Sequence, residues 1–252
     1  MFSWSPSDYT RFDRERTLSA IDLVSRISGL RPRSVIDIGC GPGNSTEVLR
    51  RAFPDAEILG IDSSPEMVSQ ARERLPDVTF EVMDARGIPG DYDLIFSNSC
   101  IQWIDDHDTL IPWLMGRLEK HGTLAVQIPM NDTEPVSIIC EEVASLPVWH
   151  YPEGKPRRHG TLSPDDYYRI LAGCSDSFEM WTTTYYHALK SHVELVEWKS
   201  GTHLRPYLDA LDESEGNRLK NEILQRLEAA YKPASDGRIL MRYERFFFTA
   251  SR

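Results

Sequence analysis

Three acids and a run of glycines occur at spacings that suit a ligand site at one edge of a β-sheet. Asp37 lies inside an apolar segment, and three glycines follow at every second position from Gly39 to Gly43. Glycine permits positive φ angles and a close approach of the backbone to a ligand. Asp62 and Asp84 end the next two apolar segments. Because ligands of parallel sheets bind outside the carboxyl ends of the strands, we expect these groups to converge there.

The positions of the acids narrow the class of ligand. Asp62 lies 23 residues beyond Gly39, close to the position where an acid commonly accepts hydrogen bonds from ribose hydroxyls. A carboxylate at Asp84 can accept a hydrogen bond from an adenine amino group. Asp37 has two interpretations: a buried acid bonded to backbone groups of the loop, or a negative charge beside a positively charged ligand. The glycines alone are also consistent with a simple tight turn.

Two cofactor classes compete for this loop. A dinucleotide pyrophosphate normally binds G-x-G-x-x-G at a helix N-terminus, whereas this loop has Asn44 in place of the last glycine. S-adenosyl-L-methionine has no phosphate but carries a sulfonium and an α-ammonium group, which an acid at Asp37 suits. The loop therefore favours S-adenosyl-L-methionine. A dinucleotide-dependent oxidoreductase and a cofactor-binding protein without catalysis are the alternatives.

Composition disfavours several other functions. The net charge of −11 argues against nucleic acid as a partner, because nucleic-acid binding relies on basic patches. No apolar run approaches the roughly 20 residues that span a bilayer, and no signal peptide is recognised, so we expect no membrane partner and a cytoplasmic location. The dispersed cysteines and histidines predict no disulfide frame and no metal site. No seam of apolar heptads is present, so we expect a monomer.

Strands alternate with helices in the first half of the chain. Strands are predicted over 34–38, 57–62, 78–84, 92–98, 122–129, 178–189 and 238–251, and helical regions over 13–28, 131–172 and 191–231. The alternation predicts an α/β fold with a doubly wound, Rossmann-like, mostly parallel sheet. The helices of the second half are expected to be insertions that form a cap over the carboxyl edge of the sheet.

Several motifs carry a family resemblance. The segments VIDIGCGPGNST, GIDSS, VMDA and DLIFSN resemble the cofactor motifs of class I S-adenosylmethionine-dependent methyltransferases. The segments WSPSDYTRFDRER, SNSCIQWIDDH, WTTTYYHALKSH, GTHLRPYL and RILMRYERFFF resemble the trans-aconitate 2-methyltransferase family over nearly the full length. The resemblance implies a seven-stranded sheet with an antiparallel last strand. It also implies a single methyltransferase domain over 1–252, with core segments at about 30–130, 176–189 and 238–251, an N-terminal lid over 1–28, and a cap from 131–172 and 191–231.

The resemblance also implies a reaction. That family transfers a methyl group from S-adenosyl-L-methionine to a carboxylate of trans-aconitate, leaving S-adenosyl-L-homocysteine. A carboxylate with a pKa of about 4 is already ionised at neutral pH, so no catalytic general base is expected. The expected partner is trans-aconitate or a similar small anionic carboxylic acid. The alternative within this fold esterifies a carrier-bound malonyl group, which needs a basic docking patch that only the KPRR segment offers.

The site residues follow from the same resemblance. The cofactor is expected to contact Asp37, Gly39, Cys40, Gly41, Asn44, Asp62, Ser63, Met67, Asp84, Ala85, Asn98 and Ser99. The substrate is expected to contact Tyr9, Phe12, Gln102, Trp103, Tyr185, Tyr186, Arg205 and Arg245. Arginine matches a carboxylate with two parallel hydrogen bonds, so Arg205 and Arg245 are expected to hold the non-reacting carboxylates, with a surface or salt-bridged arginine as the alternative. The two tyrosines could instead pack beneath the cap, and His107 is expected to be a solvated residue at a helix start.

Overall fold

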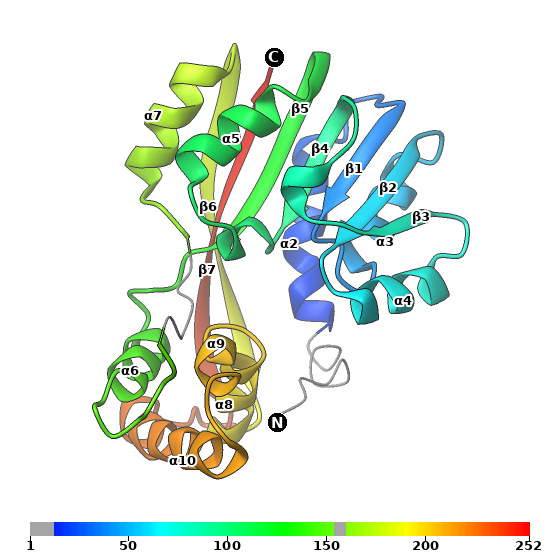
Figure 1. The fold of residues 1–252 in the computed structure, drawn as a ribbon. Coiled ribbons are helices and arrows are strands. Elements are labelled where there is room, and N and C mark those ends of the chain that lie inside the picture. Colours follow the sequence, from blue (N-terminus) through cyan, green and yellow to red (C-terminus); the bar gives the residue numbers. More distant parts are fainter. Residues whose placement is uncertain (1–12, 154–159) are drawn as a thin grey trace. The chain divides into compact units, whose positions relative to one another are not determined.

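The protein forms two compact units in the computed structural model, which describes residues 13–153 and 160–252 (Figure 1). The sheet unit contains 13–129, 160–183 and 245–252, and the helical unit contains 130–153 and 184–244. Tyr9 and Phe12 of the expected lid lie outside the described residues. The expected division into a core, a lid and a cap remains a prediction, apart from one helix discussed below.

A seven-stranded sheet has the order β3-β2-β1-β4-β5-β7-β6. Its strands are β1 (Ser34–Ile38), β2 (Glu57–Asp62), β3 (Thr79–Val82), β4 (Tyr92–Asn98), β5 (Leu118–Pro129), β6 (Ser177–Leu189) and β7 (Ile239–Ser251). Strands β1 to β5 pair in parallel, and β7 pairs with β5 in the antiparallel sense. The predicted fold class is confirmed. The β1–β4 pair is buried on both faces, as the continuous apolar segments predict.

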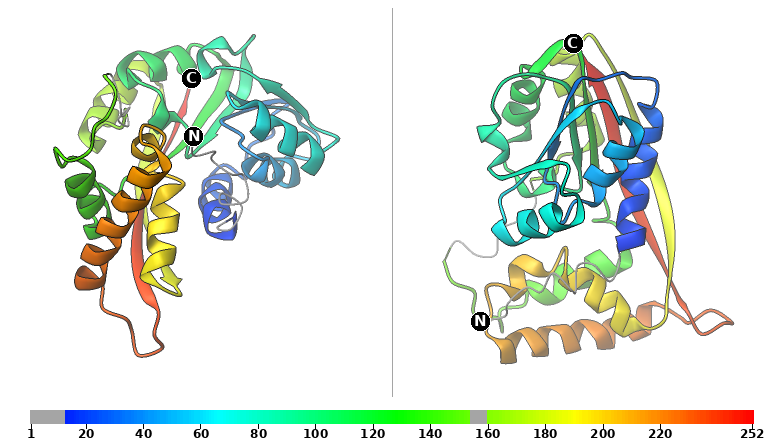
Figure 2. Two further views of the ribbon diagram at one scale, coloured as in Figure 1. Left: turned by 60° about the horizontal axis from the view of Figure 1, so that its bottom comes forward. Right: turned by 90° about the vertical axis from the view of Figure 1, so that its right-hand side faces the viewer.

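Helices cover both sides of the sheet. They are α2 (Asp13–Arg26), α3 (Asn44–Ala52), α4 (Pro65–Arg74), α5 (His107–Met115) and α7 (Pro164–Cys174), with short 3₁₀ turns η1 (Ala85–Gly87) and η2 (Ile101–Trp103). In the right-hand view of Figure 2, α2 lies on one side of the sheet and α5 on the other. Helix α4 is capped at its start: Ser64 Oγ accepts a hydrogen bond from Met67 N at 3.3 Å, and a proline occupies the first turn.

Helix α7 differs from the sequence expectation. All but its last two residues fall within the predicted cap segment 131–172, yet the helix belongs to the sheet unit. The reason is its fully buried Tyr167, whose ring stacks on that of Phe246 in β7, with 5.3 Å between centroids. Helix α7 also packs against α5. The packing of the buried Tyr167 against β7 therefore holds this helix in the sheet unit.

Two strand ends differ from the prediction by two residues or more. Strand β3 ends at Val82, where its pairing with Asp62 stops, and not at residue 84. Strand β5 begins at Leu118 and not at residue 122, because Leu118 pairs with Tyr92 across an irregularity in the β4–β5 ladder. Because β3 ends at Val82, Asp84 lies in the turn after this strand, where its side chain caps η1.

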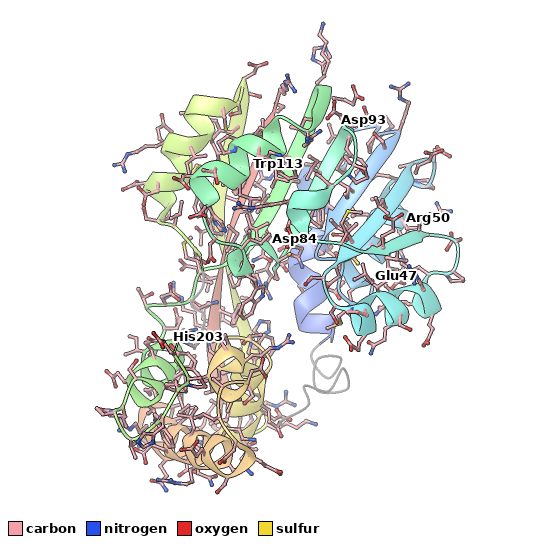
Figure 3. The ribbon with its side chains drawn as sticks, in the orientation of Figure 1. Glu47, Arg50, Asp84, Asp93, Trp113 and His203 are labelled. Atoms are coloured by element: carbon pink, nitrogen blue, oxygen red, sulfur yellow. The ribbon has the colours of Figure 1, made fainter. Side chains whose placement is uncertain are left out.

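The two ends of the parallel strands carry different acids. At the amino ends, Asp93 Oδ2 accepts hydrogen bonds from the backbone N–H groups of Arg33 and Ser34 at 2.8 and 3.1 Å, which ties β4 to β1. These bonds hold the pKa of Asp93 below its usual value against the opposing effect of burial. Figure 3 shows Asp93 and Asp84 at opposite ends of the strands. The carboxyl ends are therefore the ends at which Asp84 lies.

The helical unit has its own apolar core. It contains α6 (Pro135–Ala144), α8 (His192–Ser200), α9 (Arg205–Leu208) and α10 (Glu213–Ala230), with parts of β6 and β7. Leu219, Ile223 and Leu227 repeat at i+4 along α10 and are fully buried, as the sequence pattern predicts. None of the helices in the described part of the chain is both long enough and apolar enough to cross a bilayer.

Candidate cofactor and substrate site

The turn after β1 is built around backbone conformations that favour glycine. Gly39, Gly41 and Gly43 have φ angles of +72°, +55° and +91°. A Cβ at Gly39 would lie 2.2 Å from Cys100 Sγ, so this position has no room for a side chain. A Cβ at Gly41 would meet no described atom within 4 Å. The first glycine therefore closes the turn against β4, and the second leaves the backbone open to a ligand.

Asp37 is completely buried beneath this turn. Its Oδ2 accepts hydrogen bonds from Ser45 Oγ at 2.7 Å and Thr46 Oγ1 at 2.6 Å, both in the first turn of α3. Its Oδ1 has no hydrogen-bond partner among the described residues. Burial raises the pKa of Asp37 to about 6, although the two hydroxyls oppose this shift. The acid is thus bonded to hydroxyls, not to backbone groups of the loop, and its second oxygen is buried without a partner among the described residues.

Asp62 connects the glycine turn to the next helix. Its Oδ2 accepts a hydrogen bond from Gly41 N at 3.1 Å, and its Oδ1 accepts one from Ser64 N at 2.9 Å. A carboxylate can accept about four hydrogen bonds, so these two bonds do not by themselves saturate Asp62. The next residue, Ser63, is exposed, and Met67 is buried on α4. The structure therefore places Asp62 next to the open glycine.

Two further expected cofactor residues lie in the turn after β3. Asp84 Oδ1 accepts a hydrogen bond from Arg86 N at 2.8 Å, which caps η1, and Ala85 is buried at the start of η1. Asn44, by contrast, bridges two helices: it accepts from Arg74 Nη1 at 2.9 Å and donates to Thr17 Oγ1 at 3.4 Å. Asn44 therefore has a clear role in fixing the start of α3.

The end of β4 forms a polar cluster. Asn98 Oδ1 accepts a hydrogen bond from Ser19 Oγ of α2 at 2.8 Å. Ser99 has a φ angle of +56° and donates through Oγ to Gln127 Oε1 at 2.7 Å. Gln102 Nε2 donates to the Ser99 carbonyl at 2.8 Å, which leaves its buried Oε1 without a partner among the described residues. A non-glycine residue at positive φ is uncommon, and such conformations often occur at functional sites.

Arg245 joins this cluster from the last strand. Its side chain is 2% exposed, and its Nη1 donates to Ser99 Oγ at 2.9 Å and Gln127 Oε1 at 3.1 Å. The alternative of a surface arginine is therefore wrong for Arg245. Gln127 was not predicted, because nothing in its own segment of β5 distinguishes it from other polar strand residues.

The other expected substrate residues do not belong to the cluster around Ser99. Trp103 is partly exposed in η2 of the sheet unit. Tyr185, Tyr186 and Arg205 belong to the helical unit. Tyr185 stacks on His187, whereas Tyr186 is 64% exposed. Arg205 Nε lies 3.6 Å from Asp209 Oδ2 in a partly exposed ion pair, which fits the salt-bridged alternative for this residue.

The expectation that His107 is solvated is wrong, because the residue is 1% exposed. Its Nε2 lies 2.7 Å from the Ile101 carbonyl, and its Nδ1 lies 2.6 Å from the Tyr167 hydroxyl. Since a carbonyl only accepts, Nε2 carries the proton and Nδ1 accepts from Tyr167. Burial lowers the pKa of His107. The neutral ring thereby fixes η2, which contains Gln102 and Trp103.

Comparisons with known proteins agree with this geometry. A general profile described as "Methyltransferase domain" matches residues 35–122. The trans-aconitate 2-methyltransferase of Klebsiella pneumoniae (strain 342) is 43% identical over 99% of this chain and 98% of its own. That of Methylobacterium radiotolerans is 40% identical over 99% and 98%. The chain belongs to the trans-aconitate 2-methyltransferase family. Membership in this family contradicts the alternatives of an oxidoreductase and of a binding protein without catalysis.

Solved structures show the same fold as this member of the trans-aconitate 2-methyltransferase family. The YcgJ protein of Bacillus subtilis superposes with a TM-score of 0.61 at 12% identity, covering 93% of this chain and 98% of its own. Phosphoethanolamine N-methyltransferase 2 of Haemonchus contortus, in complex with S-adenosyl-L-methionine, has a TM-score of 0.55 at 18% identity, covering 92% and 52%. At these identities the likeness concerns the fold alone.

The family uses S-adenosyl-L-methionine as its methyl donor, and the residues of this chain fit that cofactor. The unpartnered, buried oxygen of Asp37 suits a positively charged group nearby, and the open backbone of Gly41 permits close approach. The described residues contain no group of three or more His, Cys, Asp or Glu side chains that could hold a metal ion. Burial raises the pKa of both Cys40 and Cys100, so these thiols lack the thiolate character that nucleophiles need.

Proposed function

We propose that the protein transfers the methyl group of S-adenosyl-L-methionine to a carboxylate of trans-aconitate or a similar small polycarboxylic acid. The product would be a monomethyl ester and S-adenosyl-L-homocysteine. The observation that carries this proposal is the 43% identity, over nearly the whole chain, to a relative named trans-aconitate 2-methyltransferase. The buried carboxylate of Asp37 at the glycine turn, whose Oδ1 has no partner among the described residues, supports the cofactor assignment.

We assign the cofactor's parts to the carboxyl ends of β1, β2, β3 and β4. The ribose hydroxyls would bind Asp62, and the adenine amino group would bind Asp84 beside Ala85. The backbone of Gly39, Cys40 and Gly41 would approach the amino-acid portion, and Asp37 would face its positive charge. The residues expected to border the cofactor around these groups are Asn44, Ser63, Met67, Asn98 and Ser99.

When bound, S-adenosyl-L-methionine supplies a methyl group on a positively charged sulfur. The chain's own contribution is to hold a carboxylate oxygen of the acid in line with that methyl group at about 3–3.5 Å. Such alignment can lower a barrier by roughly 7–11 kcal/mol. Because the acid is already ionised, no side chain needs to remove a proton. This explains why no nucleophile or general base is required in the cluster around Ser99.

We propose substrate contacts from η2 and from Arg245 of the last strand. Gln102 and Trp103 in η2 follow β4, and Arg245 is fixed beside Ser99 by two hydrogen bonds. A guanidinium held in one orientation suits a carboxylate better than a mobile one, because less side-chain entropy is lost on binding. Tyr9, Phe12, Tyr185, Tyr186 and Arg205 remain proposed contacts on the strength of the family resemblance alone.

A methyl-transfer assay tests the proposal. The purified protein is incubated with S-adenosyl-L-methionine and a panel of di- and tricarboxylic acids that includes trans-aconitate. We expect ester formation, detected by mass spectrometry, with an unsaturated polycarboxylic acid, and binding of S-adenosyl-L-homocysteine but not NAD by calorimetry. Absence of any ester, or transfer to a carrier-bound malonyl group in preference to free acids, would overturn the substrate assignment.

We also propose that the protein acts as a monomer in the cytoplasm, without nucleic-acid partners. The net charge of −11 supports the last point, since an acidic surface repels phosphate backbones. Light scattering of the purified chain tests the oligomeric state, and a mass close to twice 28.9 kDa would contradict it.

A further inference from the structure

Gln127 of β5 connects two residues of the polar cluster at the end of β4, and all three belong to the sheet unit. Its side chain is completely buried. Its Oε1 accepts hydrogen bonds from Ser99 Oγ at 2.7 Å and from Arg245 Nη1 at 3.1 Å. Its main-chain carbonyl accepts a third bond, from Ser99 N at 3.0 Å. Gln127 therefore holds both the backbone and the side chain of Ser99, and the same side-chain oxygen holds Arg245.

The amide of Gln127 has one orientation that satisfies both neighbours. A guanidinium only donates hydrogen bonds, so the oxygen of the amide and not its nitrogen must face Arg245. Ser99 Oγ accepts a bond from Arg245 Nη1 at 2.9 Å, and its own hydrogen is directed to Gln127 Oε1. The three side chains thus form a triangle of hydrogen bonds in which every donor and acceptor is assigned.

The triangle is kept at two costs to stability. Gln127 Nε2 is buried and has no hydrogen-bond partner among the described residues. Most buried donors in proteins are paired, because an unpaired one lowers stability. Ser99 has a φ angle of +56°, which is uncommon for a residue with a side chain. Conformations of this kind persist where the surrounding contacts impose them, and they are frequent at functional sites. Both costs indicate a role for the triangle beyond stability.

The two residues that Gln127 joins belong to different parts of the proposed reaction site. Ser99 is partly exposed at the carboxyl end of β4 and is expected to border the cofactor. Arg245 is expected to hold a carboxylate of the acid. Methyl transfer requires the cofactor and the acid to be aligned, and a displacement of about 1 Å can lower a rate by about 100-fold. Since one oxygen binds both residues, it sets the separation between them.

We propose that Gln127 is a positioning residue for methyl transfer, which fixes the cofactor-side Ser99 and the acid-side Arg245 at one separation. This inference rests on the proposed function and deepens it, because it assigns the alignment of the two reactants to a residue that touches neither. Loss of the amide should therefore lower kcat more than it weakens the binding of either reactant. A purely structural glutamine would change the melting temperature and leave the kcat of the folded enzyme unchanged.

The test compares Gln127→Met with wild type in the full-length protein, using the acid of the panel that wild type methylates fastest. Met has a similar length and neither donates nor accepts in this triangle. We expect kcat to fall about 10- to 100-fold, with smaller increases in the KM for the acid and in the dissociation constant for S-adenosyl-L-homocysteine. Thr123→Val is the matched control, because Thr123 is also buried and lies on the same face of β5, and it should behave as wild type.

Gln127→Glu is the conservative variant. It keeps an oxygen that can accept both hydrogen bonds, so we expect kcat to remain within about 3-fold of wild type, as the geometry is retained. Its negative charge opposes the binding of an anion beside Arg245, so the KM for the acid should rise about 10-fold. A kcat of Gln127→Glu as low as that of Gln127→Met would contradict the role of the acceptor oxygen.

A double-mutant cycle shows whether Gln127 acts through Ser99. Ser99→Ala removes one corner of the triangle and should itself lower kcat. In that background, Gln127→Met should lower kcat by a factor at least 3-fold smaller than it does in wild type, because coupled residues are not additive. Full additivity would overturn the inference. If Gln127→Met does not fold, Ser99→Ala and Gln127→Glu carry the test, and a wild-type kcat in Ser99→Ala overturns the inference.

The outcomes separate this inference from the proposed function. If wild type methylates no acid of the panel, both fall. If wild type methylates an acid and folded Gln127→Met has the kcat of wild type, only the inference is overturned. A lower melting temperature of Gln127→Met with an unchanged kcat would identify a structural glutamine.

Discussion

The guanidinium of Arg245 donates a hydrogen bond to the hydroxyl of Ser99 at 2.9 Å, although 146 residues separate them in the chain. The same Nη1 atom reaches Gln127 Oε1 at 3.1 Å. The guanidinium from β7 therefore lies at the end of β4, beside Ser99, which has a positive φ angle, and beside the short turn η2. This contact is the basis of the first prediction.

Arg245→Met should raise the KM for the acid substrate by about 10-fold or more, because a charge-assisted hydrogen bond is lost. The dissociation constant for S-adenosyl-L-homocysteine should change little. Steady-state kinetics and calorimetry measure the two quantities, and circular dichroism confirms the fold. Arg245→Lys keeps the charge without the planar fork and should lie between wild type and Met. An unchanged KM in a folded Arg245→Met would remove this residue from the substrate site.

Asp37 should make stability fall as the pH rises. Burial raises its pKa from 3.8 to about 6, so the folded protein binds more protons than the unfolded chain between these values. Stability attributable to this group therefore decreases through that window and is constant above it. The change amounts to about 3 kcal/mol. Asp37→Asn lacks this loss, so its stability relative to wild type should be greater at pH 8 than at pH 4.

Thermal unfolding of wild type and Asp37→Asn at both pH values measures this difference. The same substitution should weaken S-adenosyl-L-methionine binding at pH 8, because the negative charge is removed. Asp93→Asn is the comparison: it changes an acid at the amino ends of the strands, so it should lower stability without a specific loss of cofactor affinity. If the stability of wild type and that of Asp37→Asn change equally with pH, the prediction that Asp37 has a raised pKa in the folded protein is wrong.

Two glycine substitutions should separate folding from binding. Gly39→Ala places a Cβ 2.2 Å from Cys100 Sγ at a φ of +72°, so it should destabilise the fold by roughly 2 kcal/mol or more. Gly41→Ala has space and adds only the strain of a positive φ, about 1–2 kcal/mol. We expect Gly41→Ala to remain folded yet to bind S-adenosyl-L-homocysteine poorly. Urea unfolding and calorimetry, applied to both variants, provide the comparison.

The His107–Tyr167 pair should make stability fall at acidic pH. Burial lowers the pKa of His107 below its usual 6.5, so the unfolded chain binds a proton that the folded protein does not. The stability contributed by the neutral ring is complete above pH 6.5 and is lost as the pH falls below it. Tyr167→Phe leaves His107 Nδ1 without its donor and should destabilise the protein by about 1–3 kcal/mol at pH 7.5.

Tyr168→Phe provides the control for this prediction, since Tyr168 is 57% exposed on the same helix. Chemical denaturation at pH 7.5 measures both variants. If Tyr167→Phe and Tyr168→Phe unfold at the same denaturant concentration, the hydrogen bond to His107 contributes nothing to stability.

The sequence alone determined the sheet and the cofactor turn, because both depend on local patterns. The bounds of β1, β2 and β4 follow from short apolar segments, and the positive φ angles at the turn follow from glycines within a few residues of each other. Asp62 and Asp84 could be placed at one edge because parallel strands direct their carboxyl ends the same way. The motif spacing also sufficed to recognise the family.

Only the tertiary structure decided which distant side chains meet. His107 was expected in solvent, but its partner Tyr167 is 60 residues away and arrives with α7, a helix expected in the cap. Likewise, Lys199 and Arg245 belong to polar segments whose burial depends on other strands and helices. A side chain's burial and hydrogen bonds are set by elements that pack on it from elsewhere in the chain. Local composition does not contain that information, and for this reason the buried cations were found only in the folded protein.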